Sequence, residues 1–325
     1  MMNGKERALT AFAHIEADRV PVFEYTIDNP TAEFVLGRQN LCGFGGKVRG
    51  LAFNKAVLDG KVEEYYKQRL EDDLELYEKL DLDVFPHCNP QPKHQIIPDQ
   101  ISDHQWKVTD PVTGQWTIYD YSVESDVYDA VDSSLRRGGL PELEILTQQL
   151  ENQPFDPEAW DFSLVDYVLE EQGNERMVLA AADVEIGSTF DWAETFLIGL
   201  VEAPDLIHRY LDARLKTSLK LTEMLLERGV HGVHGGYDWA ANKGPIFSPR
   251  HFRKFVFPRI KQITDLCHRF GVPYIKHTDG NVNSLLNDMI EAGIDAFHAI
   301  EPRAGMNIGQ IKVDFGDRLT LIGNI

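Results

Sequence analysis

Hydrophobic and polar positions follow two different periods along the second half of the chain. Apolar residues recur at helical spacing from 205 to 228, and Gly229 follows as a stop. Short apolar runs, separated by helical patterns, predict strands at 230–234, 272–277, 294–300 and 318–322. The helical patterns between and after them cover 248–270, 282–292 and 307–315. Strands and helices that alternate without a break predict a parallel sheet.

The first half of the chain is less regular. We expect a helix at 4–14, a strand over RVPVFEY at 19–25 and a long charged helix at 58–79. A second strand, LDVFP, is expected at 82–86. RMVLAAADVEIG at 176–187 predicts a further buried strand.

Residues 96–122 carry alternating apolar positions on both sides of the turn DPVTGQ, which predicts a β-hairpin after the second strand. Trp106 and Trp116 are expected to pack across its two strands, and a lid over a pocket is the alternative. The Pro- and acid-rich residues 123–160 are expected to wrap the surface around a helix at 141–151.

Polar side chains follow nearly every predicted strand, and this decides between two parallel architectures. In an open doubly wound sheet the ligand contacts gather at one crossover, whereas in a barrel every strand end opens on the same face. The pattern therefore predicts a (β/α)8 TIM barrel, a single domain over residues 1–325 with a β-hairpin inserted after strand 2. The run GFGGKVRG at 43–50 lacks the preceding strand and following helix of a dinucleotide site.

Composition narrows the partners and the compartment. The net charge of −20 argues against binding to nucleic acid or to an anionic membrane surface, because both require a positive footprint. The three cysteines have no paired spacing, and neither a secretory signal nor a run of about 18 apolar residues is present, which favours the cytoplasm. A small-molecule substrate is expected, and a homodimer is possible.

The strongest candidate site lies in VPYIKHTDGN, where a short strand delivers His277 and Asp279 together. Imidazole nitrogen and carboxylate oxygen are metal ligands, so both are candidates, with His298 as a third ligand. The alternatives are a structural hydrogen bond from His277 to a neighbouring acid, and a helix-capping role for Asp279.

Three carboxylates are candidate catalytic residues: Asp238, Glu301 and Asp83. Asp238 directly follows a strand and suits a metal ligand or general base, or else it bonds backbone amides. Glu301 suits an acid/base role or simply turns the chain before Pro302. The side chains expected to bind substrate are Tyr237, Lys276, Asn281, Glu24, His87 and Asp183.

Several long phrases resemble the uroporphyrinogen decarboxylase superfamily, which also includes cobalamin-dependent methyltransferases that use zinc. They are KERALTAFAHIEADRVPV, VLAAADVEIGSTFDWAETFLIGLVEAPDLIHRYLD, GVHGGYDWAANKGPIFSPRHFRKFVFPRIKQI, HTDGNVNSLLNDMIEAGIDAFHAIEPRAGMNIGQIK and LIGNI. The resemblance implies one β/α barrel with its site at the carboxyl ends of the strands. It is closer to the poorly characterised, methyltransferase-like branch that shares SPRHFRKF, an HTDG-type end and an IEP end.

The methyltransferase branch implies zinc on a His-x-Cys pair at the sixth strand and a corrinoid supplied by a partner protein. Here the place of that pair is taken by His277-Thr278-Asp279, so a carboxylate replaces the thiolate. A His and carboxylate site still binds zinc, and it also suits another divalent transition metal. The resemblance thus predicts a metal-dependent methyltransferase that moves a methyl group between a small methyl donor or acceptor and the corrinoid.

Two alternatives stay open. In a decarboxylase of the uroporphyrinogen type, Asp83 would bind pyrrole NH groups, yet the arginines expected after the first strand are missing from EYTIDNPTAEF. A non-catalytic protein that binds a corrinoid or small molecule is the other alternative. The family normally continues after GNI with a loop and a last helix, so that C-terminal helix is expected to be absent from this sequence.

Overall fold

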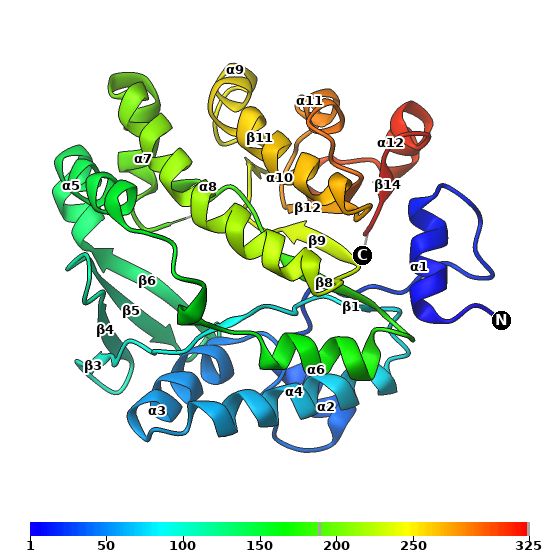
Figure 1. Cartoon of the computed structure of the whole chain (residues 1–325), viewed down its shortest axis with the longest axis horizontal. Coiled ribbons are helices and arrows are strands. Elements are labelled where there is room, and N and C mark those ends of the chain that lie inside the picture. The colour runs from blue at the N-terminus through cyan, green and yellow to red at the C-terminus, as the bar shows by residue number, and fades with distance from the viewer. Residues whose placement is uncertain (188–189, 324–325) are drawn as a thin grey trace.

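Six parallel strands form the central sheet in the computed structural model, which describes residues 1–187 and 190–323 (Figure 1). Their order is β1-β8-β9-β12-β13-β14, so each strand pairs with its successor in this parallel series. The strands are β1 (Val84–Phe85), β8 (Met177–Ala181), β9 (Gly232–Gly235), β12 (Tyr274–Thr278), β13 (Ala296–Ala299) and β14 (Thr320–Leu321). The strands predicted in the second half of the chain are therefore confirmed, with shorter bounds.

The sheet is curled, so that its first edge approaches its last strands. The amide of Asp83 donates to the carbonyl of Val22 at 2.9 Å, which attaches the segment 20–25 to β1. Phe23 in that segment places its ring 5.5 Å from the imidazole of His298, which belongs to β13 on the far side of the sheet. The structure thus shows an α/β fold with a parallel sheet curled as in part of a barrel.

Helices cover the outside of the sheet (Figure 1). Helices α6 and α8 both contact β8, and α1 contacts β1 and β8 beside the sheet. The helices are α1 (Gly4–Phe12), α2 (Asn29–Leu36), α3 (Phe53–Leu58), α4 (Val62–Lys79), α5 (Ser134–Asn152), α6 (Ser163–Gln172), α7 (Ala193–Glu202), α8 (Pro204–Glu227), α9 (Pro249–His251), α10 (Phe257–Arg269), α11 (Leu286–Glu291) and α12 (Ile308–Phe315). No helix among the described residues is long and apolar enough to cross a membrane.

The helix predicted over 248–270 is interrupted. Ser248 caps α9 by accepting from the amide of His251, as its sequence pattern predicts. A π-helical stretch, Phe252–Val256, then joins α9 to α10, and Pro258 stands in the first turn of α10. Proline has no N–H to donate into the preceding turn, so the irregular backbone comes just before it.

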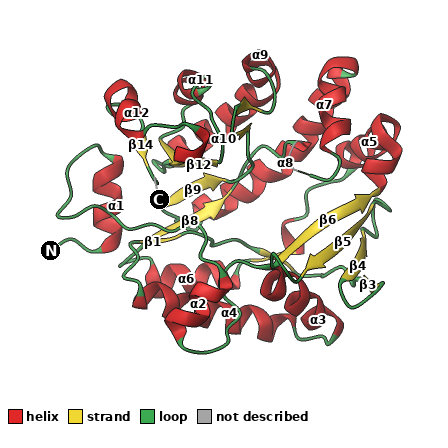
Figure 2. Ribbon diagram, turned by 180° about the vertical axis from the view of Figure 1, so that it is seen from behind, coloured by secondary structure: helices red, strands yellow, loops and turns green. Residues whose placement is uncertain are grey.

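A second, antiparallel sheet lies at the opposite end of the molecule from α1 (Figure 2). Its order is β3 (Asp99–Gln100), β4 (Gln105–Thr109), β5 (Trp116–Ser122) and β6 (Val127–Ser133), and β2 (Gln91–Pro92) pairs separately with β7 (Trp160–Asp161). Strands β4 and β5 form the predicted hairpin. The helix expected at 141–151 lies within α5, whereas β6 adds a third long strand where the sequence predicts a segment that wraps the surface.

The two tryptophans of the hairpin do not face each other. Trp106 pairs with Tyr119 and Trp116 with Thr109, so the alternation along the strands puts the tryptophan rings on opposite faces. Trp106 is 5% exposed and belongs to the core. Trp116 instead lies under the charged ends of Lys107 and Arg137, each 5.1 Å from its ring centroid.

The concave side of the curled sheet has its own small apolar layer. Val84, Met177, Leu179, Ile275 and Ala296 form it, at most 5% exposed. Paired residues of a parallel sheet point to the same side, so the residues two positions further along the strands rise above this layer. On β12 and β13 those positions carry His277 and His298 of the candidate site.

Candidate metal site at the strand ends

A layer formed by four histidines around the ring of Tyr25 lies directly above the apolar layer. His277 and His298 are partners in the register of β12 and β13, two residues beyond Ile275 and Ala296. Tyr25 stacks on His277 with ring centroids 4.5 Å apart and an interplanar angle of 15°. His87 and His234 flank the same tyrosine, each 5.2 Å from its ring. Gly236 makes room for it, since a Cβ there would lie 2.4 Å from Tyr25 Oη.

The histidines of this layer are neutral at pH 7. Burial, with the neighbouring His298 as the second cause, lowers the pKa of His277 to about 3. Burial lowers the pKa of His298 and of His87 to about 4. Nδ1 of His277 lies 2.8 Å from Nδ1 of His298, so one of the two rings donates to the other. Nε2 of His277 is directed toward Asp238 Oδ1, at 3.7 Å.

Three carboxylates gather beside His277. The amide of Asp279 donates to Asp238 Oδ1 at 2.8 Å, and the amide of Gly280 donates to Glu301 Oε2 at 2.9 Å. Burial, followed by the charges of Asp238 and Glu301, raises the pKa of Asp279. The three acids therefore repel one another, and a cation between them would relieve that repulsion.

Asp238, His277 and Asp279 form a group that suits a divalent metal ion. One potential ligand atom from each side chain lies within 4.8 Å of the other two. Neutral imidazole nitrogen and carboxylate oxygen are ordinary zinc ligands, and three protein ligands leave a coordination position open, as in catalytic sites. If Nε2 of His277 binds the ion, its Nδ1 carries the proton and donates to His298. His298, predicted as a third ligand, lies outside this group, with its Nδ1 against Nδ1 of His277.

Three of the predicted substrate-binding residues are tied to one another beneath this site. Lys276 Nζ donates to Asp183 Oδ2 at 2.5 Å and to the carbonyl of Tyr237 at 2.7 Å. The Lys276 side chain is fully buried over the ring of Trp239. The amide of Tyr237 completes the arrangement by donating to Asp183. The structure therefore gives Lys276 and Asp183 a common structural partner in the loop that positions Asp238.

Asp83 lies at the other end of its strand. It precedes β1, whereas His87 follows the same strand toward the site. Its carboxylate accepts from Arg7 at 2.5 Å, from Arg19 at 2.7 Å and from the amide of Val22. The structure thus separates Asp83 from the other predicted catalytic residues and surrounds it with cations.

The other predicted substrate-binding residues have different surroundings. His87 belongs to the histidine layer around Tyr25, and its Nε2 lies 2.7 Å from the carbonyl oxygen of Tyr25. Asn281 is used within its own loop, because its side-chain amide donates to the carbonyl of Ala304. Glu24 lines a separate pocket of about 400 Å³ whose wall is mostly apolar.

Tyr25, Arg49 and Arg69 lie near the site but were not predicted from the sequence as site residues. Tyr25 ends the first predicted strand. The other candidates were selected because they follow a predicted strand, and the same criterion applies to Tyr25. The sequence shows no cluster of basic residues along the strand ends, yet the charges of Arg49 and Arg69 both lower the pKa of His87. Arg49 comes from the π-helical stretch Lys47–Ala52 and Arg69 from α4, and their spacing in the sequence gave no signal of this proximity.

The comparisons with known proteins agree with the fold. Residues 179–325 match the sequence model of the family described as uroporphyrinogen decarboxylase (URO-D). The chain resembles the solved structure of a methyltransferase from Methanosarcina mazei with 16% sequence identity and a TM-score of 0.59, covering 100% of this chain and 83% of that one. At this level of identity the likeness concerns the fold alone.

A further solved structure, the carboxyl transferase domain from Rhizobium etli pyruvate carboxylase, matches with 12% identity, covering 92% of this chain and 36% of that one. Its TM-score of 0.26 is too low to bear on the fold. No curated protein matches the chain significantly. The resemblance to the uroporphyrinogen decarboxylase family predicted from the sequence is therefore confirmed over residues 179–325, somewhat less than half of the chain.

Proposed function

We propose that this protein is a metal-dependent methyltransferase that moves a methyl group between a small substrate and a corrinoid carried by a partner protein. The observation that carries the proposal is the group formed by Asp238, His277 and Asp279, whose potential ligand atoms lie within 4.8 Å of one another. The methyltransferase whose structure the chain resembles supports it. The substrate side of the site would lie at the carboxyl ends of the strands, as in other β/α enzymes.

The residues of the site would divide the work. Asp238, His277 and Asp279 would hold zinc or another divalent transition metal, which when bound supplies Lewis acidity toward a hydroxyl, thiol or methoxy group. His298 would keep the tautomer and the orientation of His277. Glu301, half-buried and hydrogen-bonded to the loop at Gly280, would take or return a proton at the substrate. Tyr25 would exclude water from one face of His277.

The proposal also covers the complete fold, the substrate contacts and the compartment. The curled sheet and the attached segment 20–25 would be parts of a (β/α)8 barrel with its hairpin inserted after strand 2. The substrate contacts would come from His87 and Tyr237 around the histidine layer. The three cysteines are buried free thiols, which favours the cytoplasm as the compartment.

The test is a methyl-transfer assay with the protein loaded with zinc. Methylcobalamin and a panel of small thiols would be offered in one direction, and cob(I)alamin with methoxy and methylamine compounds in the other, with the corrinoid spectrum as the readout. We expect turnover that His277→Ala and Asp238→Asn abolish. A zinc-loaded protein that turns over no member of either panel would contradict the proposal.

A decarboxylase remains the second candidate because of one observation. Arg49 and Arg69 lie close enough to His87 for their charges to lower its pKa, and guanidinium groups bind carboxylates. Uroporphyrinogen would be incubated with the protein under reducing conditions. Formation of coproporphyrinogen, lost in Arg69→Gln and retained in His277→Ala, would favour this candidate over methyl transfer.

A further inference from the structure

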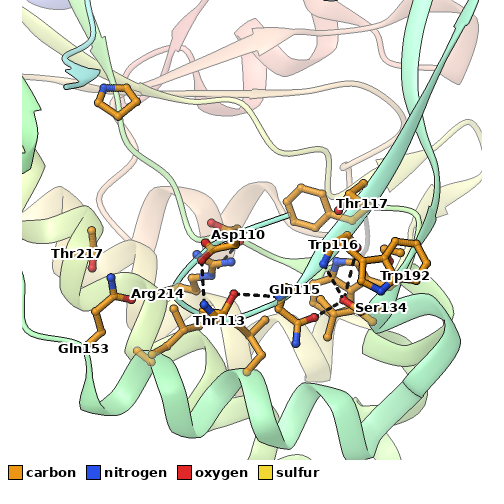
Figure 3. A pocket seen from close by; sticks show the side chains of 18 of the residues that line it. Asp110, Thr113, Gln115, Trp116, Thr117, Ser134, Gln153, Trp192, Arg214 and Thr217 are labelled. Carbon is orange, nitrogen blue, oxygen red and sulfur yellow. Dashed lines mark hydrogen bonds and ion pairs between the residues drawn. The ribbon is translucent and has the colours of Figure 1, made fainter. Parts of the chain in front are cut away.

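A cavity of about 570 Å³ lies beside the candidate metal site and is not part of it. It is lined by the hairpin strand β5, the helices α5 and α8, and residues 185 and 190–192 before α7. Figure 3 shows Trp116 and Ser134 on one side of it, Trp192 next to them, and Arg214 and Gln153 on the other. The proposed function makes no use of this space.

The charged lining of the cavity is mostly acidic. Four carboxylates line it, those of Asp110, Asp156, Glu185 and Asp191, against one guanidinium, that of Arg214. Arg214 Nε lies 3.1 Å from Glu185 Oε1, so the guanidinium of Arg214 is already paired with one of the four acids. The other three acids form no ion pair with a lysine or arginine in the part of the chain that the structure describes. An anionic ligand is therefore disfavoured in this cavity.

One of these carboxylates has an unused oxygen. Oδ2 of Asp191 is buried and has no hydrogen-bond partner among the described residues. Burial, followed by the charge of Asp191, raises the pKa of Tyr119, a second residue of the lining, so the two side chains lie near each other. A buried carboxylate oxygen without a partner is costly, and a cationic ligand in the cavity would compensate it.

The uncharged part of the wall is aromatic. Phe190 and Trp192 stack with ring centroids 5.9 Å apart, and the ring of Tyr119 belongs to the hairpin side. Trp116 also lines the cavity, but its ring already contacts Lys107 and Arg137. Aromatic faces together with carboxylates favour alkylated ammonium ions, which are attracted to the rings as well as to the charge. A bare metal ion fits less well, because Asp238, His277 and Asp279 are the one group of metal-ligating side chains close enough together in residues 1–187 and 190–323.

We propose that this cavity binds a small organic cation, of the alkylated ammonium class. The proposal concerns binding alone and goes beyond methyl transfer. The cavity borders the metal site through Phe190, whose ring lies 5.6 Å from that of Tyr237, the residue before Asp238. A bound cation would therefore sit next to the loop that carries one of the proposed ligands.

The test uses choline and its neutral isostere 3,3-dimethylbutan-1-ol, titrated into the protein as purified by isothermal calorimetry and by tryptophan fluorescence. We expect saturable binding of choline, with the isostere at least tenfold weaker. Asp191→Asn should weaken choline at least fivefold, and Phe190→Leu should also weaken it. Asp103→Asn, at an exposed position outside the cavity, should change nothing. Circular dichroism would confirm that each variant is folded.

Three results would overturn the assignment. The first is no saturable binding of choline, and the second is equal binding of the two probes, which would mean that charge plays no part. The third is choline binding that survives in Asp191→Asn and disappears in His277→Ala, because that would place the cation at the metal site. Retention of choline binding in His277→Ala supports the separate cavity, whatever the outcome of the methyl-transfer assay.

Discussion

His277 and His298 act as one unit in this site. Their Nδ1 atoms are 2.8 Å apart, and burial keeps both rings neutral at pH 7. A metal ligand must present a lone pair, so a neutral His277 needs no proton removed before it binds an ion. The position of the proton between the two Nδ1 atoms then decides whether Nε2 of His277, which faces Asp238, has a free lone pair.

The His298→Ala variant tests this arrangement. We expect zinc affinity to fall about 10- to 100-fold, because partners that orient a metal-binding histidine have effects of that size. Competition with a chromophoric chelator measures it, and His94→Ala, at an exposed position, is the matched control. Unchanged zinc affinity in His298→Ala would show that His277 needs no orienting partner.

His231 gives the chain a pH-dependent stability that does not involve the metal site. Burial, with the charge of Lys5 second, lowers its pKa to about 4, and its Nδ1 accepts from the amide of Val178. The unfolded chain therefore takes up the proton first as the pH falls below about 6.5, and stability is lost between that pH and 4.

Between pH 7 and pH 5, we expect His231→Asn to lose about 1 kcal/mol less stability than the unmodified protein. Urea unfolding at both pH values measures the difference, with His104→Asn as an exposed control. An equal loss in the His231→Asn protein would mean that this histidine has the same pKa in both states.

The sequence predicted which residues lie near the site, because they follow the carboxyl ends of strands. It did not predict what these residues bind. His277, Asp279, Asp238 and Glu301 come together as expected. Lys276 and Asp183 were expected at the substrate, but their partners are each other across 93 positions of sequence. A pairing over that distance leaves no mark in the local pattern of either strand.

At the scale of elements, the helix with a clear apolar period was predicted correctly. The end of β1 at which Asp83 lies was not. The helix predicted at 205–228 is α8 (Pro204–Glu227), because its apolar stripe and the following glycine are local signals. Asp83 was expected at the site, but it precedes β1, and its role depends on Arg7 and Arg19 from the first turns of the chain. The strand β6 was missed because the residues in and around it are rich in acids, such as Asp126, Asp129 and Asp132.

Asp83 should therefore matter for stability and not for metal binding. Its side chain is 3% exposed and that of Arg7 is 7% exposed, so Asp83→Asn leaves a buried guanidinium with one partner fewer. We expect a loss of about 3 kcal/mol in unfolding free energy with unchanged zinc affinity.

Asp81→Asn is the matched control, because that carboxylate is 89% exposed and pairs with Arg19 at the surface. Its loss should stay below about 1 kcal/mol. A stable Asp83→Asn protein that no longer turns over substrate would return Asp83 to the catalytic residues.

At the scale of the whole molecule, the sheet and its insertion have different origins. The parallel order follows from the alternation of strands and helices, which is visible in the sequence. The position of the antiparallel sheet is set by α5, which packs on α7 and α8 and so encloses the aromatic cavity. These contacts join parts of the chain more than 40 residues apart, so neither the cavity nor its lining was predictable.

The central claim is that Asp238, His277 and Asp279 bind one divalent metal ion. Inductively coupled plasma mass spectrometry of untagged protein, unmodified and as His277→Ala, tests it most directly. The account predicts about one equivalent of zinc or another divalent transition metal in the unmodified protein and almost none in the variant. Metal absent from the unmodified protein, or equal amounts in both proteins, would contradict it.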